Sequence, residues 1–186
     1  MALEIKNIES KNGVDLQLIN WEGGRDFRIL ATSGLSEVLK NQGVEEEKSF
    51  ELFFCLPSYW SLEERENPRF NWVINWLFRF SDYLVKNKTF FDHGHTIAAG
   101  NPPEPLSETM KQTYFMFSEP IDTISFFKGQ LEGKKYLAVI PLFQDEFDYK
   151  VAKGTFKLED KFRQKGHSEV LDDFRTSAVR KKYFIF

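Results

Sequence analysis

The chain opens with two stretches in which apolar and polar residues alternate, at residues 3–8 and 14–19. Alternation with a period of two places every second side chain on the same face of an extended strand. The tripeptide Lys11-Asn12-Gly13 between the two stretches consists of residue types that favour a tight turn. The pattern therefore predicts a β-hairpin at the beginning of the chain.

Two further strands are predicted before the middle of the chain. Residues 27–32 form an apolar run that ends at Ser33 and Gly34, where glycine can adopt a positive φ. Residues 49–56 are apolar and rich in aromatic residues, and Pro57 ends that run. A strand that is apolar on both faces is typical of the middle of a sheet, so we expect the second run to be central.

A long helix is predicted from Asn67-Pro68 to about Lys86. The asparagine side chain can accept hydrogen bonds from free backbone amides at a helix start, and proline has no amide that needs a partner. Polar residues follow one narrow stripe of the helix, at Asn71, Asn75, Asp82 and Lys86, while apolar and aromatic residues cover the rest. We expect this helix to be mostly buried.

The second half of the chain contains strand patterns at residues 112–117, 123–127 and 135–142, with a turn at residues 132–133. Residues 145–153 and 155–165 have the pattern of short helices that end at Gly154 and Gly166. We predict one domain over residues 1–186 of the α+β class. It would be a mixed, largely antiparallel sheet packed against a long buried helix and short C-terminal helices.

Composition and charge exclude several classes of partner. Hydrophobic residues make up 41% of the chain, including 20 Phe, 6 Tyr and 4 Trp, which is typical of a chain that folds. The net charge is −3 and the cations are scattered among acids, so we expect no nucleic-acid partner. No apolar run reaches the length of a signal peptide or a membrane span. Cys55 is the only cysteine, which favours the cytoplasm.

The segment 92–97 concentrates the polar residues that are candidates for chemistry. In a strand His93 and His95 would project from the same face, and Asp92 or Glu104 would then complete a metal site. The alternative is that one imidazole bonds the backbone while Gly94 allows a turn. No third metal ligand stands out, and no phosphate-binding loop or serine nucleophile motif is present. We expect no catalytic residue, no metal and no cofactor.

Three separated blocks of the chain carry a resemblance to a known family. They are Asp92-His93-Gly94-His95-Thr96-Ile97 with the loop at residues 98–105, the strand Glu51-Leu52-Phe53-Phe54-Cys55-Leu56-Pro57, and Val139-Ile140-Pro141-Leu142 with Glu146. Together they resemble the suppressor-of-fused domain family in its short, single-domain, bacterial-type form. The resemblance implies a fold like the N-terminal domain of that family. It also implies structural roles for the signature residues Leu56, Pro57, Gly94, His95, Thr96, Pro141 and Glu146.

The resemblance further implies that the chain binds a protein and is not an enzyme. Bacterial relatives of this type are associated with immunity proteins that neutralise a toxin, which is the favoured function. Two alternatives stay open: a peptide-binding adaptor that adds a strand at a sheet edge, and a metal-dependent hydrolase that uses His93 and His95.

Four residues are candidate contacts for a protein partner: Glu46, Tyr59, Trp60 and His93. Tyr59 and Trp60 directly follow Pro57, where large aromatic groups can anchor a partner, although packing at the edge of the core is the alternative. Replacing Trp60 or Glu46 is predicted to weaken binding without unfolding the protein. The apolar end of the chain, residues 183–186, is expected either to dock on the fold or to meet a partner.

Overall fold

The structure is a computed structural model of the chain, and it describes residues 3–21, 26–64, 66–121, 123 and 134–179. Its strands are β1 (Leu3–Lys11), β2 (Val14–Trp21), β3 (Phe27–Ser33), β4 (Glu51–Pro57), β5 (Thr96–Ala98), β6 (Tyr114–Ser118) and β7 (Tyr136–Leu142). Its helices are α1 (Leu35–Asn41), the 3-10 turn η1 (Glu46–Lys48), α2 (Pro68–Asn87), α4 (Gln144–Lys153) and α5 (Thr155–Lys165). The predicted strand at residues 123–127, apart from Thr123, the turn at 132–133 and the chain end at 180–186 lie outside the described residues.

The seven strands form one sheet in the order β1-β2-β3-β4-β7-β6-β5. Among these described strands only β4 and β7 run parallel to each other, and the other neighbouring pairs are antiparallel. The prediction of a mixed, largely antiparallel sheet in an α+β fold is confirmed. The hairpin of β1 and β2 turns at Asn12 and Gly13, which both have positive φ values of 54° and 81°. Such values suit a two-residue hairpin turn.

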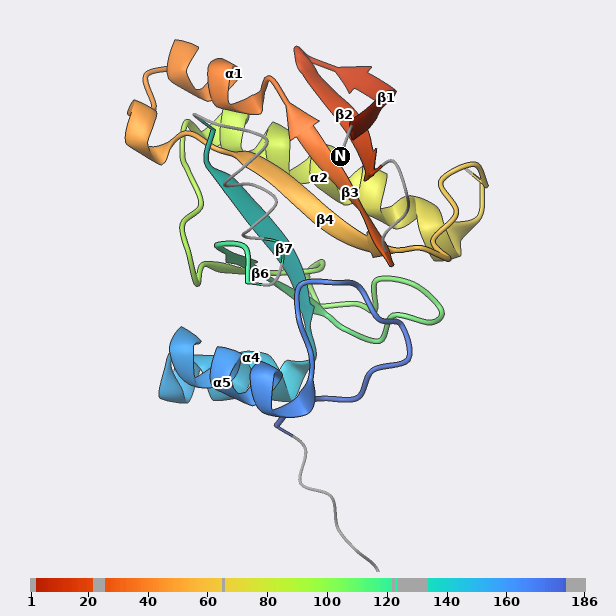
Figure 1. Cartoon of the computed structure of the whole chain (residues 1–186). Helices are drawn as coiled ribbons and strands as arrows, with labels where there is room; N and C mark the ends of the chain where they lie inside the picture. Colours follow the sequence, from red (N-terminus) through yellow and green to blue (C-terminus); the bar gives the residue numbers. More distant parts are fainter. Residues whose placement is uncertain (1–2, 22–25, 65, 122, 124–133, 180–186) are drawn as a thin grey trace, which may run out of the picture.

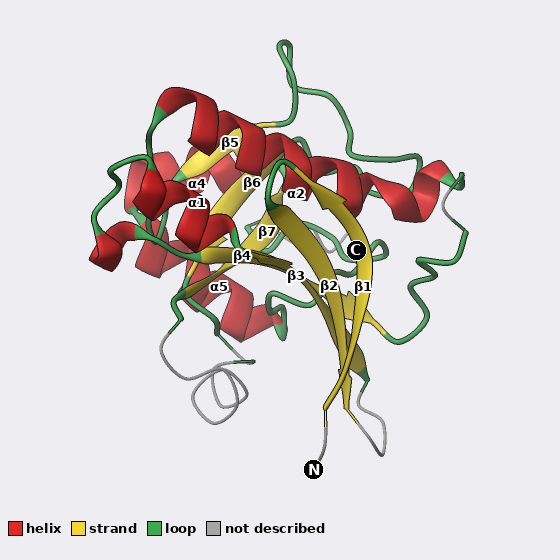
Figure 2. Ribbon diagram, turned by 90° about the horizontal axis from the view of Figure 1, so that it is seen from above, coloured by secondary structure: helices red, strands yellow, loops and turns green. Residues whose placement is uncertain are grey.

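Helices cover the sheet on both faces (Figure 1 and Figure 2). Leu52, Phe54 and Leu56 of β4 point into a core shared with α1 and α2. Phe53 and Cys55 point the other way, into a second core shared with α5. Every residue of β4 is therefore buried, and the prediction that this strand is central is confirmed.

Helix α2 begins where the sequence predicts it. The side chain of Asn67 accepts a hydrogen bond from the backbone N–H of Arg69 at 3.0 Å, and Pro68 occupies the first turn. The helix ends at Lys88, whose φ is 49°, and nine of its residues are buried. None of the helices in the described part of the chain is long and apolar enough to cross a bilayer.

Helix α1 was not predicted, because its N-terminus is capped by a residue from a distant strand. The carboxylate of Glu51 accepts hydrogen bonds from the backbone N–H groups of Gly34, Leu35 and Ser36, at 3.1–3.2 Å. It also accepts from the hydroxyl groups of Thr32 and Ser36. A seven-residue helix without a local side-chain cap gives a weak sequence signal, so this contact is what defines it.

The segment 92–97 is a strand only at its end, and its first half follows the alternative of a turn at Gly94. Residues 93 and 94 form a turn, which the N–H of His95 closes by donating to the carbonyl of Asp92 at 3.0 Å. Gly94 has a φ of 83°, a conformation that an extended strand excludes. The two histidine rings therefore do not share one face of a strand.

Candidate functional site

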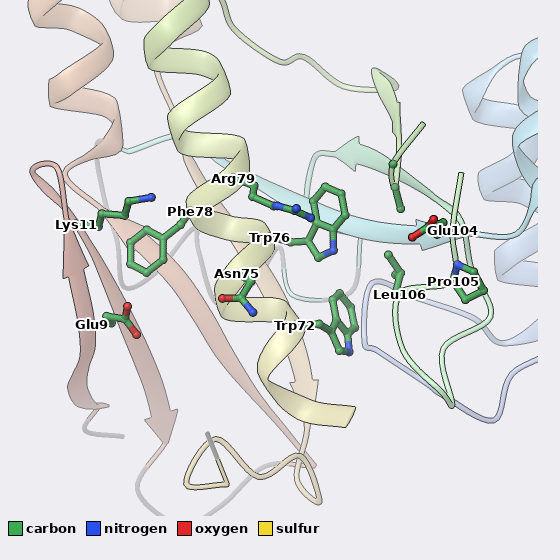
Figure 3. Close-up of a pocket in the computed structure, with 12 residues that line it drawn as sticks. Glu9, Lys11, Trp72, Asn75, Trp76, Phe78, Arg79, Glu104, Pro105 and Leu106 are labelled. Atoms are coloured by element: carbon green, nitrogen blue, oxygen red, sulfur yellow. The ribbon is translucent and has the colours of Figure 1, made fainter. Parts of the chain in front are cut away.

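A groove of about 740 Å³ crosses the exposed side of α2. Figure 3 shows α2 between the hairpin strand β1, which carries Glu9 and Lys11, and a loop that carries Glu104, Pro105 and Leu106. We call this cavity the α2 groove. Its other described lining residues are Trp72, Asn75, Trp76, Phe78, Arg79, Ala99 and Gly100.

The floor of the α2 groove is a ladder of side chains at helical spacing. Trp72, Asn75, Trp76 and Arg79 follow one another at intervals of one helical turn or less, which places them on one side of α2. The guanidinium of Arg79 lies 4.9 Å from the centre of the Trp76 ring. Trp76 is held from below by Phe115, whose ring centre is 4.7 Å away. The partly exposed Trp76 ring is therefore held in place, and the exposed Arg79 guanidinium lies over it.

An ion pair and a hydrogen bond to Asp82 join the hairpin side of the groove to α2. Lys11 donates to Asp82 at 2.6 Å, and the side chain of Asn12 donates to the same carboxylate at 3.3 Å. The ammonium group of Lys11 also lies 5.9 Å from the centre of the Phe78 ring. These contacts join residues about seventy positions apart and set the distance between the hairpin and the helix.

The opposite wall is a loop that backbone hydrogen bonds keep in place. Ala99 donates to the carbonyl of Thr113 at 2.9 Å, and Leu106 donates to the carbonyl of Gln112 at 3.2 Å. Between these anchors Glu104 donates from its backbone to the carbonyl of Ala99 at 2.8 Å. The loop therefore buries Leu106 and leaves the carboxylate of Glu104 exposed at the rim, as expected for a loop stiffened by prolines.

The α2 groove combines aromatic side chains with charges of both signs. Within the described residues, neither the Arg79 guanidinium nor the Glu104 carboxylate forms an ion pair, so both charges are available to a ligand. Tryptophan and arginine are the residue types that most often carry binding energy at protein interfaces. None of the described lining residues is a serine, cysteine or histidine. The groove thus offers an aromatic surface between a cation and an anion.

The signature residue Glu146 lies in the core, at 0% exposure. Its carboxylate accepts from both terminal nitrogens of Arg175, at 2.6 and 2.9 Å, and from the backbone N–H groups of Phe143 and Ala178. Arg175 also donates to the carbonyl of Pro141 at 2.6 Å. Pro141 and Glu146 are therefore linked through one arginine, and they tie β7 and α4 to the chain beyond α5.

Gly94, His95 and Thr96 organise the turn before β5. The N–H of Gly94 donates to the carbonyl of Phe117 at 2.7 Å, and a Cβ at Gly94 would overlap the Thr155 hydroxyl group. The Nδ1 atom of His95 accepts from the backbone N–H of Asp92 at 3.1 Å, and Thr96 pairs with Met116 of β6. Leu56 and Pro57 complete β4, with Leu56 fully buried and Pro57 paired with Phe27.

The ring of His93 faces a different set of groups from that of His95. Its Nδ1 atom lies 3.4 Å from the Ser118 hydroxyl group, and its Nε2 atom lies 3.5 Å from a carboxylate oxygen of the buried Glu159. The backbone N–H of His93 donates to Asp92, which lowers the pKa of that carboxyl group, and Lys135 adds to the effect. In the described part of the chain, no group of three or more His, Cys, Asp or Glu residues has a metal-binding arrangement.

Trp60 does not reach the surface, as a direct contact with a partner would require. Its indole is 0% exposed, donates to the carbonyl of Phe70 at 3.1 Å, and packs edge-on against the rings of Phe70 and Trp72. Tyr59 is 47% exposed, and its hydroxyl group donates to Asp173 at 2.8 Å. Burial, together with this hydrogen bond, raises the pKa of Tyr59. Packing at the edge of the core, the alternative for these two aromatic residues, holds for Trp60.

The structure brings two of the four candidate partner contacts to one end of the sheet. Glu46 precedes β4 and has a side chain that is 83% exposed. His93 lies at the same end, because its neighbours in the chain contact residues there. The Asp92 carboxylate lies 3.3 Å from the ammonium group of Lys135, which precedes β7. The Phe90 ring lies 5.1 Å from the ammonium group of Lys48, which precedes β4. Tyr59 follows β4 and lies at the opposite end. The four residues therefore do not form one surface.

The sequence did not predict Arg79 as a site residue, and it suggested Glu104 only as a metal ligand beside the two histidines. Arg79 stands three residues after Trp76 on a predicted helix, so their contact is visible in the sequence. What the sequence does not show is that β1 and the loop at residues 99–106 stand on either side of that helix. The site exists only through contacts between segments that are far apart in the chain.

The fold and the groove together define an α+β scaffold with an open groove over its long helix. The chain belongs to the suppressor of fused protein (SUFU) family, whose model matches residues 11–176. A search of curated proteins finds no match.

Three solved structures share the fold. A SUFU homologue from Neisseria gonorrhoeae has a TM-score of 0.65 and 18% identity, over 97% of this chain and 89% of that one. Drosophila Suppressor of Fused has a TM-score of 0.58 and 17% identity, over 89% of this chain and 43% of that one. The Sufu–Fu complex contains a chain with a TM-score of 0.59 and 18% identity, over 88% of this chain and 77% of that one.

Proposed function

We propose that this SUFU-family chain is a non-catalytic domain that binds a protein through the α2 groove. The observation that carries the proposal is the pairing of Trp76 with the exposed Arg79, opposite the exposed Glu104, in a cavity of about 740 Å³. An aromatic anchor surrounded by charges has the composition of a binding hot spot. The Sufu–Fu complex supports the proposal, because it shows a member of this fold together with a protein partner.

The buried signature residues support a role without catalysis. Both oxygens of Glu146 are saturated by Arg175 and backbone N–H groups, so this carboxylate is fully occupied in holding the fold together. Gly94 and His95 form the turn that docks on β6 and α5. The Glu146 carboxylate, already satisfied inside the core, is therefore not available to a substrate.

We propose more specifically that the partner is a toxin domain that this chain neutralises. The Neisseria homologue matches almost end to end, which is consistent with a compact, bacterial-type member of the family. An immunity protein requires a rigid scaffold with a complementary surface, and such complexes usually bury about 1,600 Å² in total. The α2 groove would supply the central anchors of that surface.

A second mode of binding is favoured by the position of β1. This strand is nine residues long, lies at one edge of the described sheet and contributes Glu9 and Lys11 to the α2 groove. An extended peptide in the groove would lie beside an edge strand, which is the geometry of strand addition. The peptide-binding adaptor remains the alternative function on this ground.

Genome sequencing around this gene, followed by co-expression with any toxin domain that a neighbouring gene encodes, tests the immunity function. Cells should survive with the wild-type chain and die with Arg79→Glu, because the variant reverses an exposed charge at the centre of the groove. Calorimetry should show a loss of about 30-fold or more in affinity. Lys86→Glu is the matched control, since it reverses an exposed charge on the same helix outside the groove.

Two outcomes would contradict the proposal. Equal protection by Arg79→Glu and the wild type would exclude the groove as the contact surface. Capture of an extended peptide, with no effect on any neighbouring toxin, would replace immunity by the adaptor function.

A further inference from the structure

The junction of α4 and α5 exposes both lysines and large apolar side chains. Residues 149–158, which we call the α4–α5 corner, contain the exposed Lys153 and Lys157, the half-buried Lys150 and no acidic residue. Val151 and Phe156 in the same stretch are 66% and 73% exposed. Most exposed surface of a folded chain mixes charges of both signs, so this segment stands out on a protein whose net charge is −3.

The positive charge of the corner is not neutralised by its neighbours. Within the described residues, none of the three lysines forms an ion pair. Of the nearest acids along the chain, Asp160 is neutralised by Arg163 at 3.1 Å, while Asp148 accepts from the neutral side chain of Gln144 at 2.9 Å and leaves one negative charge near three lysines. Buried Glu159 contacts His93 and Arg163. The corner therefore presents a local positive potential to solvent.

The exposed Phe156 is supported from one side by the fold. Its ring lies 5.5 Å from the ring of His93, and the adjacent Thr155 packs directly on Gly94. The turn at His93 and Gly94 thus holds Phe156 in place although most of its side chain is exposed. A large apolar residue held in solvent between cations has the composition of a contact point for a partner.

We propose that the α4–α5 corner binds an acidic peptide segment of a partner protein. Carboxylates of the segment would contact Lys150, Lys153 and Lys157, and apolar side chains between them would pack on Val151 and Phe156. Charge complementarity favours this occupant. An anionic membrane fits less well, because a membrane-surface helix needs a continuous apolar face, and the exposed residues of α4 include Gln144, Asp145 and Asp148.

Fluorescence anisotropy with a labelled synthetic peptide, in which leucine and phenylalanine stand between glutamates, tests the proposal. We expect saturable binding that weakens as salt increases. The exposed double variant Lys153→Glu/Lys157→Glu should lose about tenfold or more in affinity, and Phe156→Ser a similar factor. A peptide with the same glutamates but serine in place of the apolar residues should bind the wild type more weakly.

Three controls establish that the peptide binds at the corner and at no other lysine-bearing surface. Lys86→Glu/Lys111→Glu reverses two exposed lysines outside the corner and should bind the peptide as the wild type does. Arg79→Glu should also be unaffected, so a failure of the groove proposal and a failure of this one can be told apart. Circular dichroism checks that each variant is folded.

The proposal is overturned if the peptide does not bind at about 1 mM, or if the corner variants bind as tightly as the wild type. It is also overturned if vesicles of phosphatidylcholine and phosphatidylserine bind the wild type more tightly than the peptide does and the same variants abolish that binding. The corner would then be a membrane contact.

Discussion

Replacing Glu146 by glutamine tests whether the most buried signature carboxylate holds the fold together. The wild-type side chain accepts four hydrogen bonds, two at each oxygen, from Arg175, Phe143 and Ala178. Glutamine replaces one oxygen by an NH₂ group, so two of the four donors would face another donor. The buried guanidinium of Arg175 would also lose its counter-charge.

The expected loss of stability is large. Breaking a buried ion pair by removing one partner costs about 3–5 kcal/mol, and the total stability of a domain is about 5–15 kcal/mol. Glu146→Gln should therefore lower the midpoint of urea unfolding strongly while leaving the slope of the transition unchanged. Glu47→Gln, which changes an exposed carboxylate, should stay within about 0.5 kcal/mol of the wild type.

A double variant separates the ion pair from the shape of the site. In Glu146→Met/Arg175→Met both charges are absent, so part of the lost stability should return, because no unpaired charge remains in the core. A cost of less than about 1 kcal/mol for Glu146→Gln would refute this reasoning. The carboxylate would then be dispensable for folding, and a reactive role for Glu146 would have to be considered again.

Three further predictions follow from buried or strained positions. Trp60→Ala should lower the free energy of unfolding in urea by about 3–5 kcal/mol, because it empties a fully buried site. A variant as stable as the wild type would contradict the place of Trp60 in the core. Gly94→Ala should lower the free energy of unfolding by about 2 kcal/mol or more. Adding Thr155→Ala should restore only the part caused by the clash with Thr155, because the strained positive φ at residue 94 remains. Full recovery in the double variant would exclude backbone strain. Burial, with the nearby Arg175, lowers the pKa of His167, so the folded state binds fewer protons than the unfolded state. Stability should therefore fall as pH drops from about 6.5 toward the folded pKa, and His167→Gln should remove that part of the pH dependence in unfolding curves.

Local patterns in the sequence were sufficient for most elements of the fold. The period of two at residues 3–8 and 14–19, together with Asn12 and Gly13, defines the first hairpin. The pair Asn67-Pro68 defines the start of α2, and Gly154 and Gly166 define the ends of α4 and α5. These signals depend on neighbours within a few residues, which is why they can be interpreted without a structure.

The residue types alone did not determine which of the aromatic and charged side chains are exposed. Trp60 and Tyr59 are neighbours at the end of β4, yet one is fully buried and the other is 47% exposed. His93 and His95 are two residues apart, but the turn at Gly94 directs their rings to different partners. Exposure depends on what the rest of the chain places nearby, and that information is not local.

The sequence by itself determined the class of the fold, the family, and the position of β4 as a buried strand in the middle of the sheet. Only the tertiary structure decided which surfaces are open, and with them the two surfaces that we propose for binding. The cap on α1 comes from Glu51, the α2 groove requires β1 and a loop about ninety residues later in the chain, and the α4–α5 corner is supported by the turn at His93. Each of these features depends on contacts between distant segments, whose positions follow from the packing of the whole core.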